Sequence, residues 1–270
     1  MDAERSKNQL KNGPVGCKPS WTKGAQVERQ DEGAWRLEAP AGPQGHYRLA
    51  QLDDYGSLPR RAFPHQAPYK LSLQARCSAE TIPGTWGFGL WNNPFGMAIL
   101  RGAELLRLPA LPNAAWFFFA SPPNYLSLRD DLPADGYLAA TFRSPRLPWL
   151  LALPGVPFLP LALLPPVARL LRRLGRRIVQ EDAARLALDP TEWHSYALEW
   201  QPEQVIFLVD GANVLQTGVA PQGPLGLVMW IDNQFASLGP GGRFRFGTLA
   251  NLEPAWCEIR EVEVEAGTSG

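Results

Sequence analysis

Short runs of alternating apolar and polar residues, separated by glycine and proline, place the strongest constraint on how this chain folds. Successive side chains of a β-strand point to opposite faces, so each run predicts a strand with one buried face. Many short strands joined by turns are typical of a sandwich or a barrel. The runs occupy residues 69–75, 86–91, 114–120, 137–142, 195–200, 205–209, 225–231, 243–246 and 258–265. The sequence therefore predicts an all-β, mostly antiparallel domain.

The segment 195–217 is the clearest part of this pattern. Alternation in its first run directs Tyr196, Leu198 and Trp200 toward one face, which we expect to be the core. Asp210 and Gly211 follow the second run, and this pair favours the positive backbone φ angles of a two-residue hairpin turn. Two consecutive antiparallel hairpins are therefore predicted here.

The composition excludes some classes of partner. Lys+Arg and Asp+Glu number 26 each, so the formal net charge is zero and nucleic acid is not an expected partner. Ten tryptophans are more than a core usually uses, and a surplus is typical of a ligand groove. Three cysteines without a paired spacing predict free thiols, and three histidines argue against a histidine-rich metal site. No cofactor is expected.

The pattern also predicts how the chain is organised. Residues 1–33 are polar and lack a sustained period, so we expect a flexible arm there, followed by a single sandwich domain over 34–266. An excursion at 145–190 interrupts the sandwich pattern. The first residues contain no apolar signal-peptide core, so the expected location is the cytoplasm.

The excursion begins with an apolar segment and ends with a basic one. Residues 147–168 include no charged side chain, but their six prolines deny them the continuous hydrogen bonding of a membrane-spanning helix. The segment that follows has apolar residues at helical spacing and arginines largely on the other side, which predicts an amphipathic helix. Its apolar residues are Val167, Leu170, Leu171, Leu174 and Ile178.

Three hypotheses account for this excursion. The helix packs its leucines on the sandwich and leaves its arginines in solvent, or it forms a lid over an apolar ligand. Alternatively, the apolar loop enters a bilayer surface while the arginines meet anionic headgroups, which would make the protein a peripheral membrane protein. The residues assigned to a membrane or lid role are Trp149, Phe158, Arg172, Arg173, Arg176 and Arg177.

Three segments resemble a known family. The run IPGTWGFGLW at 82–91, the run WHSYALEWQPE at 193–203 and the run IFLVDG at 206–211 are similar to motifs of the family 16 glycoside hydrolases. These enzymes are part of the concanavalin A-like lectin/glucanase superfamily. The resemblance covers roughly residues 45–265. It implies a curved two-sheet jelly roll with a ligand groove on its concave face, and His194 belongs to the pattern of the fold.

The sequence departs from this family at the catalytic motif. The hydrolases carry E-x-D-x-E on one strand, because a retaining glycosidase needs two carboxylates about 5 Å apart. The corresponding interval here is WFFFAS at 116–121, which has no carboxylate. Asp130 and Asp131 are adjacent and would face opposite ways on a strand. Glu261, Glu263 and Glu265 are expected on the solvent face of a late strand. Any enzymatic activity is therefore not expected to be that of a conventional retaining glycosidase.

The groove would then be lined by aromatic side chains with a few polar ones. Alternation would place Trp86 and Phe88 on the groove side of one strand, and Trp230 and Asp232 on that of another. An acid enclosed by aromatic residues has a raised pKa, which suits acid catalysis, so Asp232 is the catalytic candidate. A capped strand end is the alternative interpretation of Asp232 and its neighbours. The ligand-binding candidates are Trp86, Phe88, Asn92, Trp116, Phe118, Tyr125, Trp230 and Gln234.

Three functions fit these observations. The first is a glucanase-fold protein that binds an apolar or amphipathic ligand, such as a lipid, terpenoid or glycolipid, and transforms it by acid/base or cyclisation chemistry. The second is a carbohydrate-binding protein, or a family 16-like hydrolase with an unusual acid pair. The third is an interaction module in which the basic helix docks on a membrane or a protein.

Overall fold

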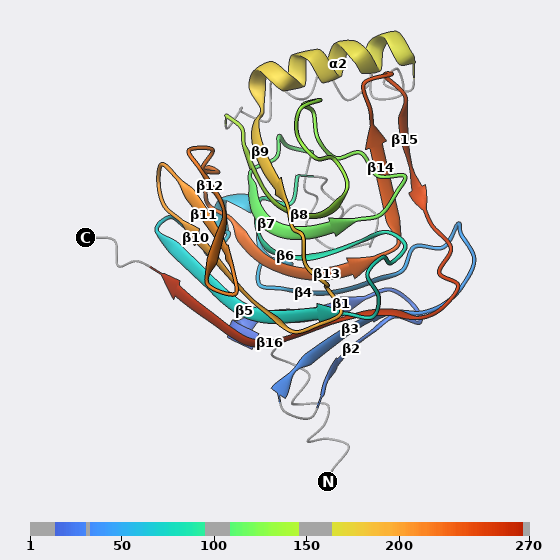
Figure 1. Ribbon diagram of the computed structural model, residues 1–270, viewed down its shortest axis with the longest axis vertical. Coiled ribbons are helices and arrows are strands. Elements are labelled where there is room, and N and C mark those ends of the chain that lie inside the picture. Colours follow the sequence, from blue (N-terminus) through green and yellow to red (C-terminus); the bar gives the residue numbers. More distant parts are fainter. Residues whose placement is uncertain (1–13, 31–32, 95–108, 146–163, 267–270) are drawn as a thin grey trace.

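The computed structural model describes residues 14–30, 33–94, 109–145 and 164–266, and two antiparallel sheets of seven strands form its framework (Figure 1). Sheet A contains, in spatial order, β1 (Lys18–Trp21), β4 (Leu49–Asp53), β13 (Gly226–Asp232), β6 (Thr85–Trp91), β7 (Ala114–Ala120), β8 (Gly136–Arg143) and β9 (Gln180–Arg185). Sheet B contains β12 (Ala212–Thr217), β11 (Val205–Val209), β10 (His194–Trp200), β5 (Tyr69–Cys77), β16 (Ala255–Ala266), β3 (Trp35–Ala39) and β2 (Gln26–Arg29). The expected antiparallel sandwich is confirmed.

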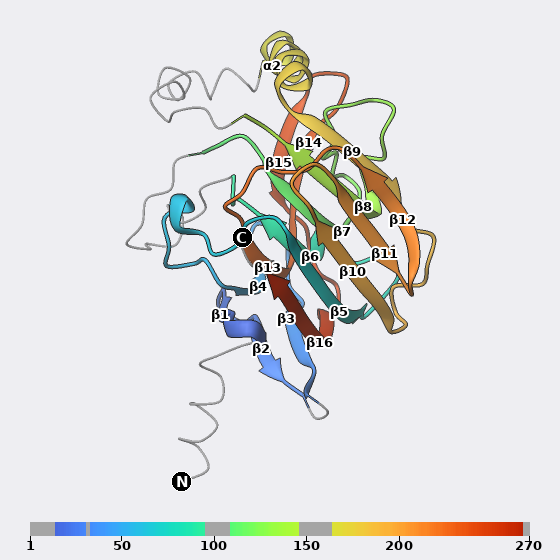
Figure 2. The same cartoon turned by 90° about the vertical axis from the view of Figure 1, so that its left-hand side faces the viewer.

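Smaller elements complete the structure. A two-stranded sheet pairs β14 (Gln234–Leu238) with β15 (Phe244–Thr248). The helix α2 (Pro165–Ile178) lies across one end of the sandwich, near the tip of the β14–β15 hairpin (Figures 1 and 2). Two 3₁₀ turns occupy Pro14–Gly16 and Arg60–Ala62.

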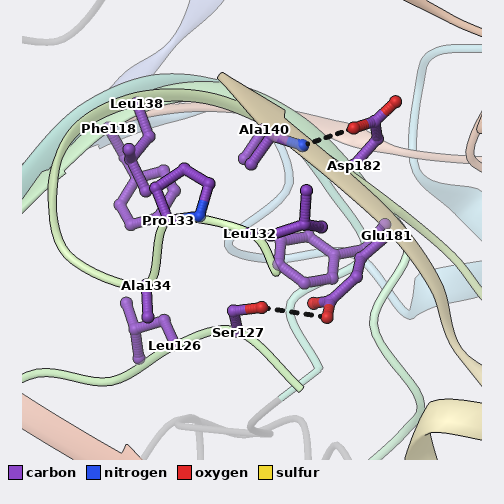
Figure 3. Close-up of a pocket in the computed structure, with 12 residues that line it drawn as sticks. Phe118, Leu126, Ser127, Leu132, Pro133, Ala134, Leu138, Ala140, Glu181 and Asp182 are labelled. Carbon is purple, nitrogen blue, oxygen red and sulfur yellow. Dashed lines mark hydrogen bonds between the residues drawn. The ribbon is translucent and has the colours of Figure 1, made fainter. Parts of the chain in front are cut away.

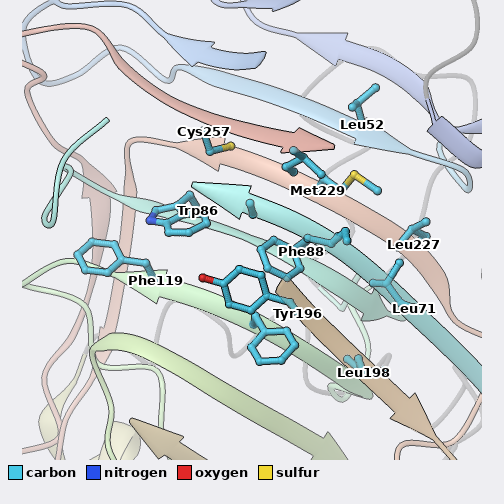
Figure 4. Close-up of a cluster of buried hydrophobic side chains, with 14 of the residues drawn as sticks. Leu52, Leu71, Trp86, Phe88, Phe119, Tyr196, Leu198, Leu227, Met229 and Cys257 are labelled. Carbon is cyan, nitrogen blue, oxygen red and sulfur yellow. The ribbon is translucent and has the colours of Figure 1, made fainter. Parts of the chain in front are cut away.

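The core lies between the two sheets. Tyr196, Leu198 and Trp200 are each at most 2% exposed, as the alternation in 195–200 predicts. Figure 4 shows Tyr196 and Leu198 of sheet B facing Trp86 and Phe88 of sheet A. The strands β5 and β10 of sheet B bury one set of alternating side chains, and burial of such large groups is the main stabilising contribution to a sandwich of this kind.

The turn between β11 and β12 has the predicted geometry. Asp210 and Gly211 both adopt positive φ, at 50° and 78°. His194 Nδ1 lies 2.7 Å from Asp210 Oδ2, and the backbone N–H of Ser195 donates to Asp210 Oδ1 at 2.9 Å. His194 therefore ties the start of β10 to this turn, in agreement with a role in the fold.

Two predicted boundaries are wrong. The expected arm over 1–33 contains β1 and β2, which pair with β4 and β3, and Val27 of β2 is buried in the core. The excursion ends at Val179, since 180–185 form β9, whose Gln180 pairs with Arg143 of β8. These three strands are too short and polar to show alternation, and pairing with a neighbouring strand defines them. The cysteines Cys17, Cys77 and Cys257 are buried free thiols.

The helix α2 has the predicted location, but its faces are reversed. Leu170, Leu171, Leu174 and Ile178 are 41–49% exposed, whereas Arg172 is only 4% exposed. The hypothesis that the leucines pack on the sandwich is therefore wrong, and Arg172 is not available for a membrane or a ligand. None of the helices in the described ranges is long and apolar enough to cross a membrane. Trp149 and Phe158 lie outside the described residues.

Candidate functional site

The face of sheet A that is turned away from sheet B carries the candidate site, and we call it the groove face. Figure 1 shows the central strands of sheet A curving around this face. On β6, Gly87 and Gly89 occupy groove-face positions. A Cβ on Gly87 would lie 2.8 Å from Cβ of Phe118, and one on Gly89 would lie 2.7 Å from Cβ of Trp116. The glycines therefore leave room for two aromatic residues of β7.

Trp86 and Phe88 do not line the groove, contrary to the expectation from the sequence. Both side chains belong to the core cluster between the sheets and are at most 1% exposed. Alternation identifies which residues share a face, but not which of the two faces meets the core. The glycines at 87 and 89 were the available signal, since a strand with two glycines on one face leaves its large residues to fill the core on the other.

Three tryptophans gather on the groove face, and we call them the tryptophan cluster: Trp91 of β6, Trp116 of β7 and Trp230 of β13. The ring centroids of Trp91 and Trp230 lie 6.3 Å apart with nearly parallel planes, and Trp116 lies 5.7 Å and 5.6 Å from them. All three are half-buried. The sequence reasoning missed Trp91 because it assigned the opposite face of β6 to the groove.

A hydrogen-bond chain links this cluster to Asp232. Trp230 Nε1 donates to Thr85 Oγ1 at 2.9 Å, and Thr85 Oγ1 donates to Asp232 Oδ1 at 2.8 Å. The N–H of Gln234 also donates to Oδ1, and the Tyr47 hydroxyl lies 3.4 Å from Oδ2. Asp232 is 8% exposed, and this burial raises its pKa to about 6. Because Oδ1 already accepts two hydrogen bonds, a proton on this carboxyl would reside on Oδ2.

Sheet A places two further carboxylates on the groove face, and both have internal partners. Asp53 accepts hydrogen bonds from Gln51 Nε2 at 2.7 Å and from the N–H of Gly56 at 2.6 Å. Its pKa is raised, because burial disfavours the charged form more than these bonds favour it. Glu181 accepts from Ser127 Oγ at 3.0 Å and from the N–H of Arg129 at 2.5 Å.

The spacing of these acids does not match a glycosidase pair. Asp53 pairs with Val228, which lies four residues from Asp232 on β13. At the rise of a β-strand this separation is about 13 Å. A retaining pair needs about 5 Å and an inverting pair about 6.5–9.5 Å. The strands of sheet A that the structure describes therefore present no such pair on the groove face.

Other candidates lie apart from the cluster. The Asn92 amide donates to the carbonyl of Leu111 at 2.8 Å and accepts from the N–H of Asn113 at 3.1 Å, so it is engaged in holding a loop. Tyr125 packs beneath the Arg172 guanidinium, at 5.1 Å from the ring centroid. Gln234 begins β14 and contributes its backbone to Asp232. Of the predicted residues, the structure brings together Trp116, Phe118, Trp230 and Asp232.

The β7–β8 connection covers the other half of the groove face. Leu126, Leu132 and Ala134 from this connection meet Phe118 and Leu138 of the sheet (Figure 3). The cavity between them measures about 10 Å³, no more than one water molecule requires. The chain itself therefore fills this apolar half.

Solved structures resemble this chain, whereas family models and curated sequences do not. No protein-family model matches the sequence, and no curated protein matches it. A β-glucanase of Bacillus licheniformis is 12% identical, with 93% of this chain and 92% of that chain covered and a TM-score of 0.46. A pseudo β-1,3-glucanase of Mycobacterium tuberculosis is 13% identical, with 90% and 78% covered and a TM-score of 0.46.

A third solved structure, an endo-β-galactosidase of Clostridium perfringens that releases GlcNAcα1-4Gal, is 12% identical, with 88% and 54% covered and a TM-score of 0.44. At these identities the likeness concerns the fold alone. The structure neighbours of this chain include glycoside hydrolase and glucanase-type proteins.

Proposed function

We propose that this protein binds a glycan on the tryptophan cluster and does not hydrolyse it by a paired-carboxylate mechanism. The observation that carries the proposal is the cluster itself: three half-buried indoles on a curved sheet face, beside a hydrogen-bonded Thr85–Asp232 pair. Indole faces pack against the apolar faces of sugar rings, while nearby polar groups satisfy the hydroxyls.

Asp232 acts in this proposal as a positioning residue. It accepts a hydrogen bond from the Thr85 hydroxyl, which orients Thr85 Oγ1 to accept a hydrogen bond from the Trp230 N–H. The Trp230 indole is thereby fixed beside the other two rings, and an ordered aromatic face loses less conformational entropy when it binds.

The geometry gives less support to an apolar or amphipathic ligand such as a lipid, terpenoid or glycolipid. Sites for such molecules are usually cavities of about 300–1,000 Å³ with a predominantly apolar lining. The apolar half of the groove face encloses only about 10 Å³, because Leu126 and Leu132 occupy it. What is left for a ligand is the half-exposed cluster, where polar side chains are close by.

Binding measurements with defined oligosaccharides test the proposal. We would titrate the full chain with gluco- and galacto-oligosaccharides of β linkage by calorimetry, and compare Trp116→Ala and Trp230→Ala with the wild type. Loss of a stacking indole is expected to weaken binding at least about tenfold. Trp21→Ala is the matched control. Trp21 is 50% exposed, and it pairs with Ala50, whose side chain points to the core side of β4, so Trp21 is not on the groove face.

Two outcomes would contradict the proposal. Equal oligosaccharide affinity in the cluster variants and in Trp21→Ala would place any glycan elsewhere. Absence of glycan binding, together with saturable binding of a fatty acid or terpenoid probe that Trp116→Ala abolishes, would establish the apolar-ligand function instead.

A further inference from the structure

The helix α2 is fixed to the sandwich by its polar inner side. Arg172 donates from Nη1 to the carbonyl of Ser127 at 2.6 Å and to that of Leu238 at 2.8 Å, and from Nη2 to Asp130 at 2.6 Å. Gly175 packs against Leu128, where an added Cβ would lie 3.2 Å from Cδ1. A buried arginine and a close backbone contact therefore determine which side of α2 faces the protein.

This orientation leaves the apolar stripe of the helix on the outside. The described residues include nine exposed large hydrophobic side chains, and five of them lie between 164 and 178. Such a concentration on one element marks an interaction surface, whereas isolated exposed apolar residues are ordinary. The five are Leu164, Leu170, Leu171, Leu174 and Ile178, at 41–52% exposure.

The same end of the molecule carries unpaired positive charge. Arg173 and Arg177 are exposed and have no carboxylate partner in the part of the chain that the structure describes. The β14–β15 hairpin contributes exposed Arg243 and Arg245, and its turn approaches α2 closely at Gly242. The whole chain has zero formal net charge, so these arginines give this end of the molecule a local excess of positive charge.

We propose that α2 docks on an anionic lipid surface and lies parallel to it. The stripe of Leu170, Leu171, Leu174 and Ile178 would enter the boundary between headgroups and acyl chains, as in interfacial amphipathic helices. Arg173 and Arg177, on the neighbouring side of the helix, would meet the anionic headgroups. The inference uses surfaces that the glycan-binding proposal does not use, so the two can fail independently.

Vesicle co-sedimentation of the full chain tests this surface. We expect binding to vesicles of phosphatidylcholine with about one third phosphatidylglycerol, weak binding to pure phosphatidylcholine, and a decrease as the salt concentration rises. The double variant Arg173→Gln/Arg177→Gln should bind the anionic vesicles about 30-fold more weakly. Leu171→Gln/Leu174→Gln should lose at least about tenfold.

Matched controls separate this surface from general effects. Arg29→Gln and Leu252→Gln change exposed residues on β2 and on the segment before β16, and both should bind as the wild type does. Circular dichroism would verify that each variant is folded. No binding to anionic vesicles, or equal losses in control and helix variants, would overturn the proposal. So would a leucine variant that alters only the oligomeric state, since this result would identify a second copy as the occupant.

Discussion

Single residues decide what the groove face can do, and Asp232 shows how. Its carboxyl is buried next to Trp230 and Thr85, and burial raises its pKa to about 6. Thr85, Tyr47 and the backbone of Gln234 donate toward it and oppose this shift, but desolvation is the larger effect. The side chain thus combines a raised pKa with hydrogen bonds from three neighbouring residues.

The raised pKa predicts a pH dependence of stability. Because the folded-state pKa lies above the ordinary value of 3.8, the contribution of Asp232 is fully present below pH 4 and is lost as the pH rises through about 6. An asparagine at this position does not titrate, so Asp232→Asn removes this pH-dependent loss of stability. Relative to the wild type, its free energy of unfolding should increase by about 2 kcal/mol between pH 4 and pH 7. Urea unfolding at both pH values measures the difference.

If the free energies of unfolding of Asp232→Asn and the wild type differ by the same amount at pH 4 and at pH 7, the pKa of Asp232 is not raised. Urea unfolding measures stability and requires no assay of activity or ligand binding. It therefore reports the electrostatic environment of the residue independently of any ligand.

Alternation in the sequence predicts the buried face of a strand only where the other face is exposed to solvent. Alternation correctly directed Tyr196, Leu198 and Trp200 to the core, because sheet B has a solvated outer face and only one set could be buried. On β6 both faces are covered, so alternation alone did not distinguish the face of Trp86 from that of Trp91. The choice depends on contacts with β7, which are distant in sequence and are not visible in a local pattern.

Elements were easier to predict than their surroundings, and α2 is the clearest case. The spacing of its leucines predicted a helix, which the structure confirms over Pro165–Ile178. The pattern could not show that Ser127 and Leu238 offer carbonyl groups to Arg172 at the contact. Because Arg172 donates to these two carbonyl groups, the polar side of α2 faces the sandwich.

Replacement of Arg172 should therefore destabilise the protein more than replacement of any exposed arginine on α2. Arg172→Met leaves the carbonyls of Ser127 and Leu238 without this donor and leaves Asp130 with Arg176 alone, and we expect a loss of about 3 kcal/mol. Arg177→Met, at an exposed position of the same helix, should change stability by less than about 0.5 kcal/mol. Denaturant unfolding of both variants gives the comparison, and similar values would disprove the anchoring role.

At the scale of the whole molecule, the β7–β8 connection joins the two proposed surfaces. Leu126 covers the apolar half of the groove face, and Ser127 and Asp130 hold Arg172 of α2. A lipid-bound helix and a glycan on the tryptophan cluster would therefore occupy neighbouring parts of one protein. The two proposals together predict a glycan held close to a membrane surface.

The spacing of carboxylates across sheet A predicts the absence of ordinary glucanase activity. Release of reducing sugar from β-1,3- and mixed-linkage glucans should not exceed the background of a heat-inactivated sample. Asp53→Asn and Asp232→Asn should leave that result unchanged. Robust hydrolysis that is abolished by either single change would contradict this prediction. It would show that Asp53 and Asp232 act together, although their positions along the sheet are about 13 Å apart.

The position of β16 has a consequence for biosynthesis. This strand lies between β5 and β3, which pair with it and not with each other, so sheet B stays divided until residues 255–266 exist. At a translation rate of about 5–20 residues per second, β5 waits roughly 10–40 s for this partner. During that interval its edge is open to wrong pairing. We therefore expect nascent chains to depend on chaperones until the ribosome has passed this segment.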